Sequence, residues 1–347
     1  MKIEGEERRA VEFDADSVQL TLLNQLLLPG KIEFVRISNH IAATKAITRM
    51  VVRGAPAIGA TGAYGLALAA HNSAAQTKED LTKELSAAKD LLVSARPTAN
   101  DLEHWVSRVF HASSQESSIS AMKATAIQEA VRVAEESAEE CRLMGEVAHH
   151  LIKDENGVLT HCNAGALATV DYGTALAPIR RAARERSFTV YIGRTGPYFQ
   201  GARLTTWELA QENIPHVLVD DNAVFHHMST GEIDTVIVGC DRAAVNGDAA
   251  NKIGTLGRAI AAKYYDIPFY VALPKTTFDA KCANGKAIPI EERAAEEILY
   301  AWNGPRLAPE GTPVRNMSFD ITPKELITGY ITSQGILSAE QLGSHLS

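Results

Sequence analysis

The chain has 347 residues, which is long for one ordinary domain and suits two. Hydrophobic residues make up 46% and charged residues 22%, a composition typical of a folded soluble protein. The net charge of -8 argues against a surface for nucleic acid or for an anionic membrane. A small anionic ligand stays compatible with it, because a few cationic side chains and backbone N–H groups can bind one phosphate.

The opening residues MKIEGEERRAVEF contain no apolar signal region, and no apolar run approaches the roughly 20 residues that span a bilayer. The four cysteines show no CxxC pairing, so we expect neither a zinc site nor a disulfide framework; they are Cys141, Cys162, Cys240 and Cys282. We therefore expect a cytoplasmic protein with reduced thiols and no membrane partner.

Residues 1–150 are predicted to form a mostly helical N-terminal domain. Helical patterns cover residues 37–52, 54–70, 78–95 and 117–153, and Ser38–Asn39 is a capping signal for the first of them. The strand signal in this half is confined to short segments such as KIEFVRI.

Residues 151–347 alternate between short β-branched runs and helical segments. The strand-like runs are VLTH, SFTVYIG, HVLVDD, DTVIVGC and PFYVAL. Between them lie ARLTTWELAQEN, AVFHHMSTG and KIGTLGRAIAAKYY, which have helical patterns. The alternation predicts an α/β, Rossmann-like domain with a parallel sheet and helices on both faces. Its ligands should bind beyond the C-terminal ends of the strands.

Cys162 follows the first of these strands and precedes the small residues of NAGALAT. A helix start there would lower the pKa of a thiol and attract phosphate. A buried structural thiol is the alternative, and the residues alone favour it. Neighbouring His161 is either a partner that supports the site or a strand residue that faces the other way. Because adjacent strand residues alternate, His161 and Cys162 are not both expected to enter one site.

Asp241 follows the strand VIVG, where apolar neighbours would raise the pKa of its carboxyl and suit it to general acid catalysis. Pairing with Arg242, or capping of a turn, is the alternative. Cys240 is expected to pack away from the site. The turn VNGDAAN is predicted to lead to a helix beginning near Lys252, where Asn251 and Lys252 could bind hydroxyls or phosphate.

Arg53 in RGAPAIG and Arg96 in SARPTAND are possible anion ligands, and Gln200 could bind a sugar hydroxyl. A surface role is the alternative for each arginine. The sequence has no GxxxxGK[ST] phosphate loop and no GxGxxG after a strand, so ATP and NAD chemistry have no support. HExxH is absent as well, and we expect no metal.

Several segments together resemble the methylthioribose-1-phosphate isomerase family. They are MVVRGAPAIGA, SARPTANDL, LTHCNAGALAT, QGARLTTWEL, VIVGCDRAAVNGDAANKIGT, IPFYVALP, IPIEER, APEGTPVRN and FDITPKELITGYITSQGIL, in the family's order over about residues 20–338. The wider superfamily includes regulatory subunits of a translation-initiation exchange factor and ribose-1,5-bisphosphate isomerase.

The resemblance implies a homodimer of chains with a helical and a Rossmann-like domain. It also implies conversion of 5-methylthioribose 1-phosphate to 5-methylthioribulose 1-phosphate, a step of methionine salvage, with no cofactor. Cys162 and Asp241 match the family's catalytic pair, so the resemblance reverses the interpretation of Cys162 as a structural thiol. The positions that match its substrate-binding residues are Arg53, Gly54, Ala55, Arg96, Gln200, Asn251 and Lys252.

The segment GRTGPYF departs from the family's usual ETRP-type run. Arg194 stands where a glutamate is usual and Gly196 where an arginine is usual. The change could alter loop packing alone or substrate choice. An isomerase for 5-deoxyribose 1-phosphate, in 5-deoxypentose salvage, is therefore an alternative function. A non-catalytic subunit of the translation-factor type is a further one.

Overall fold

The computed structural model describes residues 1–96 and 100–346, which form two compact units. Unit 1 contains Met1–Arg142 and Gly165–Gly173, and unit 2 contains Leu143–Ala164 and Thr174–Ser347. The chain therefore leaves unit 2 shortly after Cys162 and returns to it nine residues later, whereas the sequence suggested one boundary near residue 150. Residues 97–99 of the SARPTANDL segment lie outside the described residues. Within the described part, no helix has the length and apolar character needed to cross a membrane.

Unit 1 contains helices α1 to α5, two short strands and a three-stranded antiparallel sheet in the order β3-β4-β5. Its strands are β1 (Lys2–Ile3), β2 (Glu6–Glu7), β3 (Val11–Asp14), β4 (Gln19–Leu23) and β5 (Phe34–Ile37). Its helices are α1 (His40–Thr48), α2 (Ala55–Asn72), α3 (Lys78–Ser94), α4 (Asn100–Ser114) and α5 (Ile119–Ala148), whose end belongs to unit 2. The predicted helices and the strand within KIEFVRI are confirmed, and the Asn39 side chain caps α1. Helix α4 and strands β1 to β4 were not anticipated.

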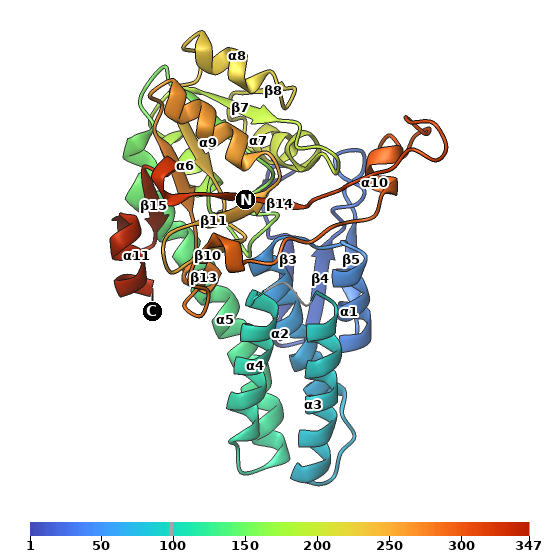
Figure 1. Cartoon of the computed structure of the whole chain (residues 1–347). Coiled ribbons are helices and arrows are strands. Elements are labelled where there is room, and N and C mark those ends of the chain that lie inside the picture. Colours follow the sequence, from blue (N-terminus) through green and yellow to red (C-terminus); the bar gives the residue numbers. More distant parts are fainter. Residues whose placement is uncertain (97–99, 347) are drawn as a thin grey trace. The chain divides into compact units, whose positions relative to one another are not determined.

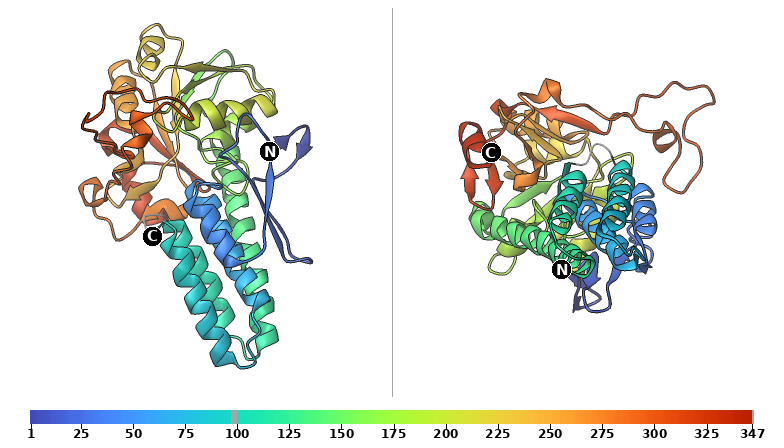
Figure 2. Two further views of the ribbon diagram at one scale, coloured as in Figure 1. Left: turned by 90° about the vertical axis from the view of Figure 1, so that its right-hand side faces the viewer. Right: turned by 90° about the horizontal axis from the view of Figure 1, so that it is seen from below.

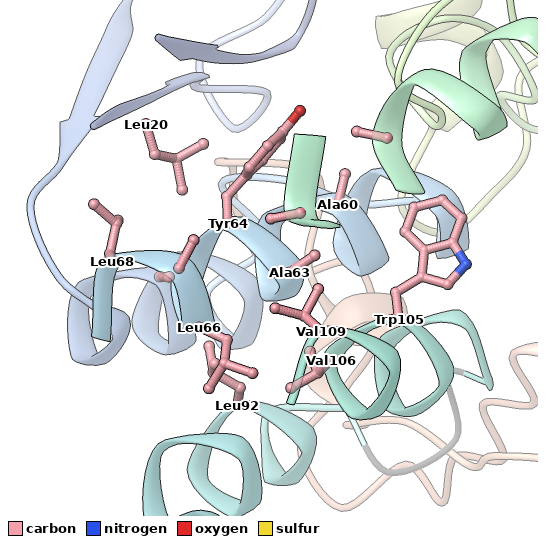
Figure 3. Packing of buried hydrophobic residues seen from close by; sticks show 14 of the residues in the cluster. Leu20, Ala60, Ala63, Tyr64, Leu66, Leu68, Leu92, Trp105, Val106 and Val109 are labelled. Atoms are coloured by element: carbon pink, nitrogen blue, oxygen red, sulfur yellow. The ribbon is translucent and has the colours of Figure 1, made fainter. Parts of the chain in front are cut away.

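Helix α2 is the centre of the unit 1 core. It packs against α1, α3 and α4, whose long axes lie side by side in Figure 2. Small residues make this packing possible, since a Cβ on Gly59 would lie 2.7 Å from the Trp105 ring. Figure 3 shows Val106 and Val109 of α4 directed at the same helix. The run of glycines and alanines in residues 54–70 thus lets four helices meet closely.

Unit 2 is built on a mostly parallel seven-stranded sheet in the order β16-β15-β12-β9-β6-β7-β8. Figure 1 labels β7, β8 and β15 of this sheet. Its strands are β6 (Gly157–Thr160), β7 (Thr189–Gly193), β8 (His216–Val219), β9 (Thr235–Val238), β12 (Phe269–Ala272), β15 (Gly329–Thr332) and β16 (Gly335–Leu337). Its helices include α6 (Leu176–Ala182), α7 (Thr206–Gln211), α8 (Val224–Ser229), α9 (Thr255–Tyr264), α10 (Glu296–Leu299) and α11 (Ala339–Leu346). The predicted parallel α/β fold is confirmed.

Both faces of this sheet are covered by helices. Val158 and Ile237 pack against α6 and α7 on one face, while Leu159, Val236 and Val238 pack against α8 and α9 on the other. The alternation follows from the strand period of two, because successive side chains point to opposite faces.

A second sheet of unit 2, with four strands in the order β13-β10-β11-β14, corrects the prediction of a helix near Lys252. Strands β10 (Arg242–Ala244) and β11 (Ala249–Lys252) form an antiparallel hairpin, and β13 (Phe278–Asp279) and β14 (Phe319–Thr322) flank it. Lys252 therefore ends a strand, and the helix begins at Thr255.

Candidate active site

The loops after β6, β7 and β9 lie at one edge of the large sheet of unit 2. β6 is the central strand of the three and pairs in parallel with both neighbours. Because the C-terminal ends of parallel strands meet at the same edge, Cys162, Thr195 and Asp241 follow strand ends that are adjacent in space. This edge is where the sequence placed the ligand.

Cys162 is held by its backbone. Its φ of 60° is left-handed, an uncommon conformation for a residue with a side chain. Its N–H donates to Thr195 Oγ1 at 3.0 Å, and its carbonyl oxygen accepts from Thr205 Oγ1 at 2.6 Å. The residue is 8% exposed. Side chains from two separate segments therefore fix the turn that carries the thiol.

His161 is a buried neutral residue beside this turn. Its Nε2 lies 2.9 Å from the carbonyl oxygen of Ile253, and its Nδ1 lies 3.3 Å from Thr195 Oγ1. Burial, together with the charge of Arg258, lowers the pKa of His161 well below its ordinary value. The neutral ring then donates through Nε2–H and accepts at Nδ1.

The prediction that His161 and Cys162 face opposite sides assumed that both belong to the strand, whereas β6 ends at Thr160. The His161 ring and the backbone N–H of Cys162 both contact the hydroxyl of Thr195, which fits the other role left open for His161, a partner that supports the site.

Asp241 follows β9 and opens the hairpin β10–β11, where its N–H donates to the carbonyl oxygen of Ala250 at 2.9 Å. It is exposed, so the apolar surroundings that the sequence suggested are not found among the described residues. Arg242 donates to Asp279 at 3.4 Å. Cys240 packs against the sheet core, and burial raises the pKa of its thiol, as expected of a packing residue.

Asn251 and Lys252 lie at the end of β11. The Asn251 amide is buried and donates to Thr255 Oγ1 at 3.1 Å. The Lys252 ammonium lies 4.5 Å from the centre of the Phe319 ring. The first turn of α9 is occupied by the Asp320 carboxylate, which accepts from the N–H of Gly254 at 2.7 Å. An anionic ligand near α9 would therefore depend on Lys252 more than on the helix terminus.

Gln200 is buried in the loop after β7, immediately before the π-helix η2 (Gly201–Thr205). Its Oε1 has no hydrogen-bond partner among the described residues. An unsatisfied buried acceptor costs about 1–3 kcal/mol, so a ligand hydroxyl that donates to it would be favoured. The loop needs glycine at position 201, where a Cβ would lie 1.9 Å from the carbonyl oxygen of Gly193.

The remaining predicted ligand residues belong to unit 1. Gly54, with φ of 98°, is the N-cap residue of α2, which begins at Ala55. A Cβ on Gly54 would lie 2.3 Å from the carbonyl oxygen of Ala168. Arg53 precedes this turn and Arg96 follows the end of α3, both half-buried. Five of the predicted residues (Cys162, Gln200, Asp241, Asn251 and Lys252) thus belong to unit 2, where Cys162 and Asp241 follow adjacent strands, and the other four belong to unit 1.

Three residues of this edge were missed by the sequence analysis. Arg258 of α9, 2% exposed, donates from Nη2 to Asp221 Oδ1 at 2.7 Å. The Asp221 carboxylate also accepts the N–H of Thr195 at 2.9 Å. Burial lowers the pKa of Arg258, while Asp221, Asp320 and the Cys162 thiol oppose that shift. Thr195 and Asp221 could have been recognised as candidates, because each follows a predicted strand. The helical pattern around Arg258 contains no comparable signal.

The unusual Arg194 is 48% exposed. Its Nη1 donates to Asp220 at 3.2 Å and its guanidinium lies 4.9 Å from the centre of the Phe199 ring. Gly196 donates its N–H to Asp221 at 2.8 Å, and a Cβ there would meet only ordinary contacts. Both departures are therefore compatible with the packing of the loop.

Comparison with known proteins identifies the family. The Initiation factor 2 subunit family matches residues 51–339. A methylthioribose-1-phosphate isomerase from Acetivibrio thermocellus is 48% identical over 321 residues, covering 92% of this chain and 94% of its own.

Two solved structures share the whole fold. The 5-methylthioribose 1-phosphate isomerase from Pyrococcus horikoshii superposes with a TM-score of 0.90 at 37% identity, covering 98% of this chain and 96% of its own. A protein described as translation initiation factor eIF-2B, subunit delta, from A. fulgidus superposes with a TM-score of 0.87 at 40% identity. The match covers 96% of this chain and 97% of the other. The chain belongs to the methylthioribose-1-phosphate isomerase family, within the Initiation factor 2 subunit family.

Proposed function

We propose that this protein is an aldose–ketose isomerase that converts 5-methylthioribose 1-phosphate to 5-methylthioribulose 1-phosphate. The observation that carries the proposal is the arrangement of Cys162 and Asp241, which follow two adjacent parallel strands, β6 and β9. Relatives that bear the isomerase name cover more than nine-tenths of the chain, and both residues stand in the segments that resemble the family.

The reaction requires a proton for the ring oxygen and transfer of hydrogen from C2 to C1. We assign the first task to Asp241, in its protonated form, as the C1–O ring bond breaks. Because Asp241 is exposed in the free chain, the bound substrate would have to exclude water from its carboxyl. Oxidation at C2 balances reduction at C1, so the reaction needs no external redox partner.

Cys162 is assigned to the hydrogen transfer. In an enediol route its thiolate would remove the proton from C2 and return it to C1. In a direct hydride shift the hydrogen would pass from C2 to C1 with its electron pair, and Cys162 would stabilise charge on the substrate. In both routes the proton lost by the C2 hydroxyl balances the proton that Asp241 gives to the ring oxygen. The enediol route requires the thiolate form of Cys162, which a cation near the sulfur would favour.

Binding of the sugar phosphate would use several polar groups. Within unit 2, Gln200 Oε1 is suited to accept from a sugar hydroxyl and Lys252 to bind the phosphate, while the roles of Arg53 and Arg96 stay predictions from the resemblance. The homodimer and the cytoplasmic location remain predictions of the sequence.

Turnover of 5-methylthioribose 1-phosphate by the purified chain tests the function. We expect C162S and D241N each to lower kcat by about a hundredfold or more, because acid–base groups contribute that much. C282S is a matched control, since the Cys282 thiol donates to the carbonyl oxygen of Asn284 in the loop after β13 and packs against the smaller sheet of unit 2. Full activity in both C162S and D241N would reject the assigned roles.

A preference for 5-deoxyribose 1-phosphate is the second candidate, which the replacements Arg194 and Gly196 favour. The two sugars differ at C5 by a methylthio group and a hydrogen, a difference that an apolar pocket distinguishes only modestly. Comparison of kcat/KM for the 5-methylthio, 5-deoxy and unmodified ribose 1-phosphates decides between them.

The name of the A. fulgidus relative favours a third candidate, a non-catalytic initiation-factor subunit. A stoichiometric complex with an initiation factor, together with no turnover of any of these pentose phosphates, would establish it in place of the isomerase.

A further inference from the structure

We propose that Thr195 is a positioning residue for Cys162, acting through a hydroxyl that fixes the left-handed turn carrying the thiol. The inference rests on the proposed function, in which Cys162 acts on the substrate. The hydroxyl joins the loops after β6 and β7 at the sheet edge, beyond the last residues of both strands.

The first observation is conformational. Cys162 has φ of 60° and Thr195 has φ of 62°. A β-branched residue such as threonine rarely adopts this region, and it persists there only where surrounding contacts determine it. Both strained residues meet in one hydrogen bond, from the N–H of Cys162 to Thr195 Oγ1 at 3.0 Å. The strain is therefore concentrated where the two loops are joined.

The second observation is that Thr195 is itself anchored on both sides. Its N–H donates to the Asp221 carboxylate at 2.9 Å, and Asp221 is held by the buried Arg258. Its hydroxyl can donate to the Gly193 carbonyl oxygen at 3.2 Å or to His161 Nδ1 at 3.3 Å. Thr195 is fully buried.

These contacts give the Thr195 oxygen a defined orientation. Donation of its proton to Gly193 or to the neutral His161 leaves a lone pair for the N–H of Cys162. Loss of the hydroxyl would remove the acceptor for that N–H and free the turn, while the covalent framework and the thiol stay in place. Small displacements of a reacting group can cost as much as a hundredfold in rate.

Two substitutions at Thr195 separate the hydroxyl from the rest of the side chain. Thr195→Val keeps the shape and β-branching and removes the hydroxyl, whereas Thr195→Ser keeps the hydroxyl. We expect the valine variant to lose at least about tenfold in kcat with KM within about twofold, and the serine variant to recover most of the activity. Thr206→Val is the control, because that hydroxyl donates to the Ala202 carbonyl oxygen within its own helical segment.

Amide hydrogen exchange of the peptide containing Cys162 tests the positioning without any substrate. Its exchange should be at least about tenfold faster in Thr195→Val and near the parent rate in Thr195→Ser and Thr206→Val. Parent-like kcat and exchange in Thr195→Val would overturn the proposal. If C162S keeps full activity, the proposed role of the thiol fails, but the exchange experiment still decides whether Thr195 fixes the turn.

Discussion

Arg258 and Asp221 form an ion pair at 2.7 Å that ties helix α9 to the loop after β8. The guanidinium is 2% exposed, and its second terminal nitrogen, Nη1, donates to the Gly254 carbonyl oxygen at 2.9 Å. The carboxylate also receives the N–H groups of Thr195 and Gly196. A charge pair thus shapes the backbone of the loop that contacts Cys162.

Removal of the carboxylate should destabilise the protein, because it leaves a buried cation uncompensated. We expect D221A to lower the free energy of unfolding by about 2–4 kcal/mol, allowing for the partial exposure of Asp221. D221N should cost less, since its amide oxygen can replace Oδ1 and accept from Arg258 and from the N–H of Thr195, although the N–H of Gly196 loses its acceptor, Oδ2. Urea unfolding measures both. The matched control is D220A, which should lower the free energy of unfolding by less than about 1 kcal/mol, because the ion pair of Asp220 with Arg194 is exposed. Equal effects of D221A and D220A would contradict the expectation.

The parallel sheet could be predicted because its strands have a strong local signal. Runs such as VIV and VYI are rich in β-branched and aromatic residues and are bounded by turn residues, and helical patterns occur between the strand-like runs. Cys162 and Asp241 each come directly after one of these strand-like runs, so the sequence alone was enough to predict that both lie at one edge of the sheet.

The hairpin β10–β11 and the anchoring of Cys162 could not be predicted in the same way. The strand AANK is small and polar, and pairing with β14 rather than its own pattern makes it a strand. Arg258, Asp221 and Thr195 are far apart in the sequence, and a single chain carries no signal for such a contact. The segment 165–173 shares the small-residue composition of its neighbours, so its membership of unit 1 was invisible as well.

The turn at Gly54 should not tolerate a side chain. In G54A the Cβ would combine a positive φ with a clash 2.3 Å from the Ala168 carbonyl oxygen, at the start of α2. Gly5 is a control in the same unit, because its φ of 87° is similar and nothing lies within 4 Å. G5A should cost about 1–2 kcal/mol for the strained φ, and G54A about 1–3 kcal/mol more. Thermal and urea unfolding of the two variants measure the difference, and equal stabilities would show that the turn can relax.

Protonation of His161 should oppose folding under mildly acidic conditions. Its folded-state pKa lies well below the ordinary value of about 6.5, so below pH 6.5 the unfolded chain binds a proton that the native protein does not. The contribution of neutral His161 to the free energy of unfolding is therefore fully present above pH 6.5. It falls by about 1.4 kcal/mol per pH unit as the pH drops below that value.

Urea unfolding of the parent and of H161Q at pH 7.5, 6.5 and 5.5 tests this dependence. Glutamine can donate to Ile253 and accept from Thr195 without titrating. H161Q should therefore show a shallower loss of stability between pH 6.5 and 5.5, whatever its stability at pH 7.5. Identical slopes in the two proteins would mean that His161 is protonated in the folded state.

The unusual loop residue Arg194 should affect stability little, because both members of its ion pair with Asp220 are about half exposed. We expect R194A to change the free energy of unfolding by less than about 1 kcal/mol. Its side chain lies over Phe199, the residue before Gln200, so its effect on substrate choice can be measured separately. For R194A, the ratio of kcat/KM for 5-methylthioribose 1-phosphate to kcat/KM for 5-deoxyribose 1-phosphate should lie within about threefold of the ratio for the parent protein. A larger change in the ratio, with stability intact, would assign Arg194 a role in selecting the group at C5 and would strengthen the 5-deoxyribose alternative.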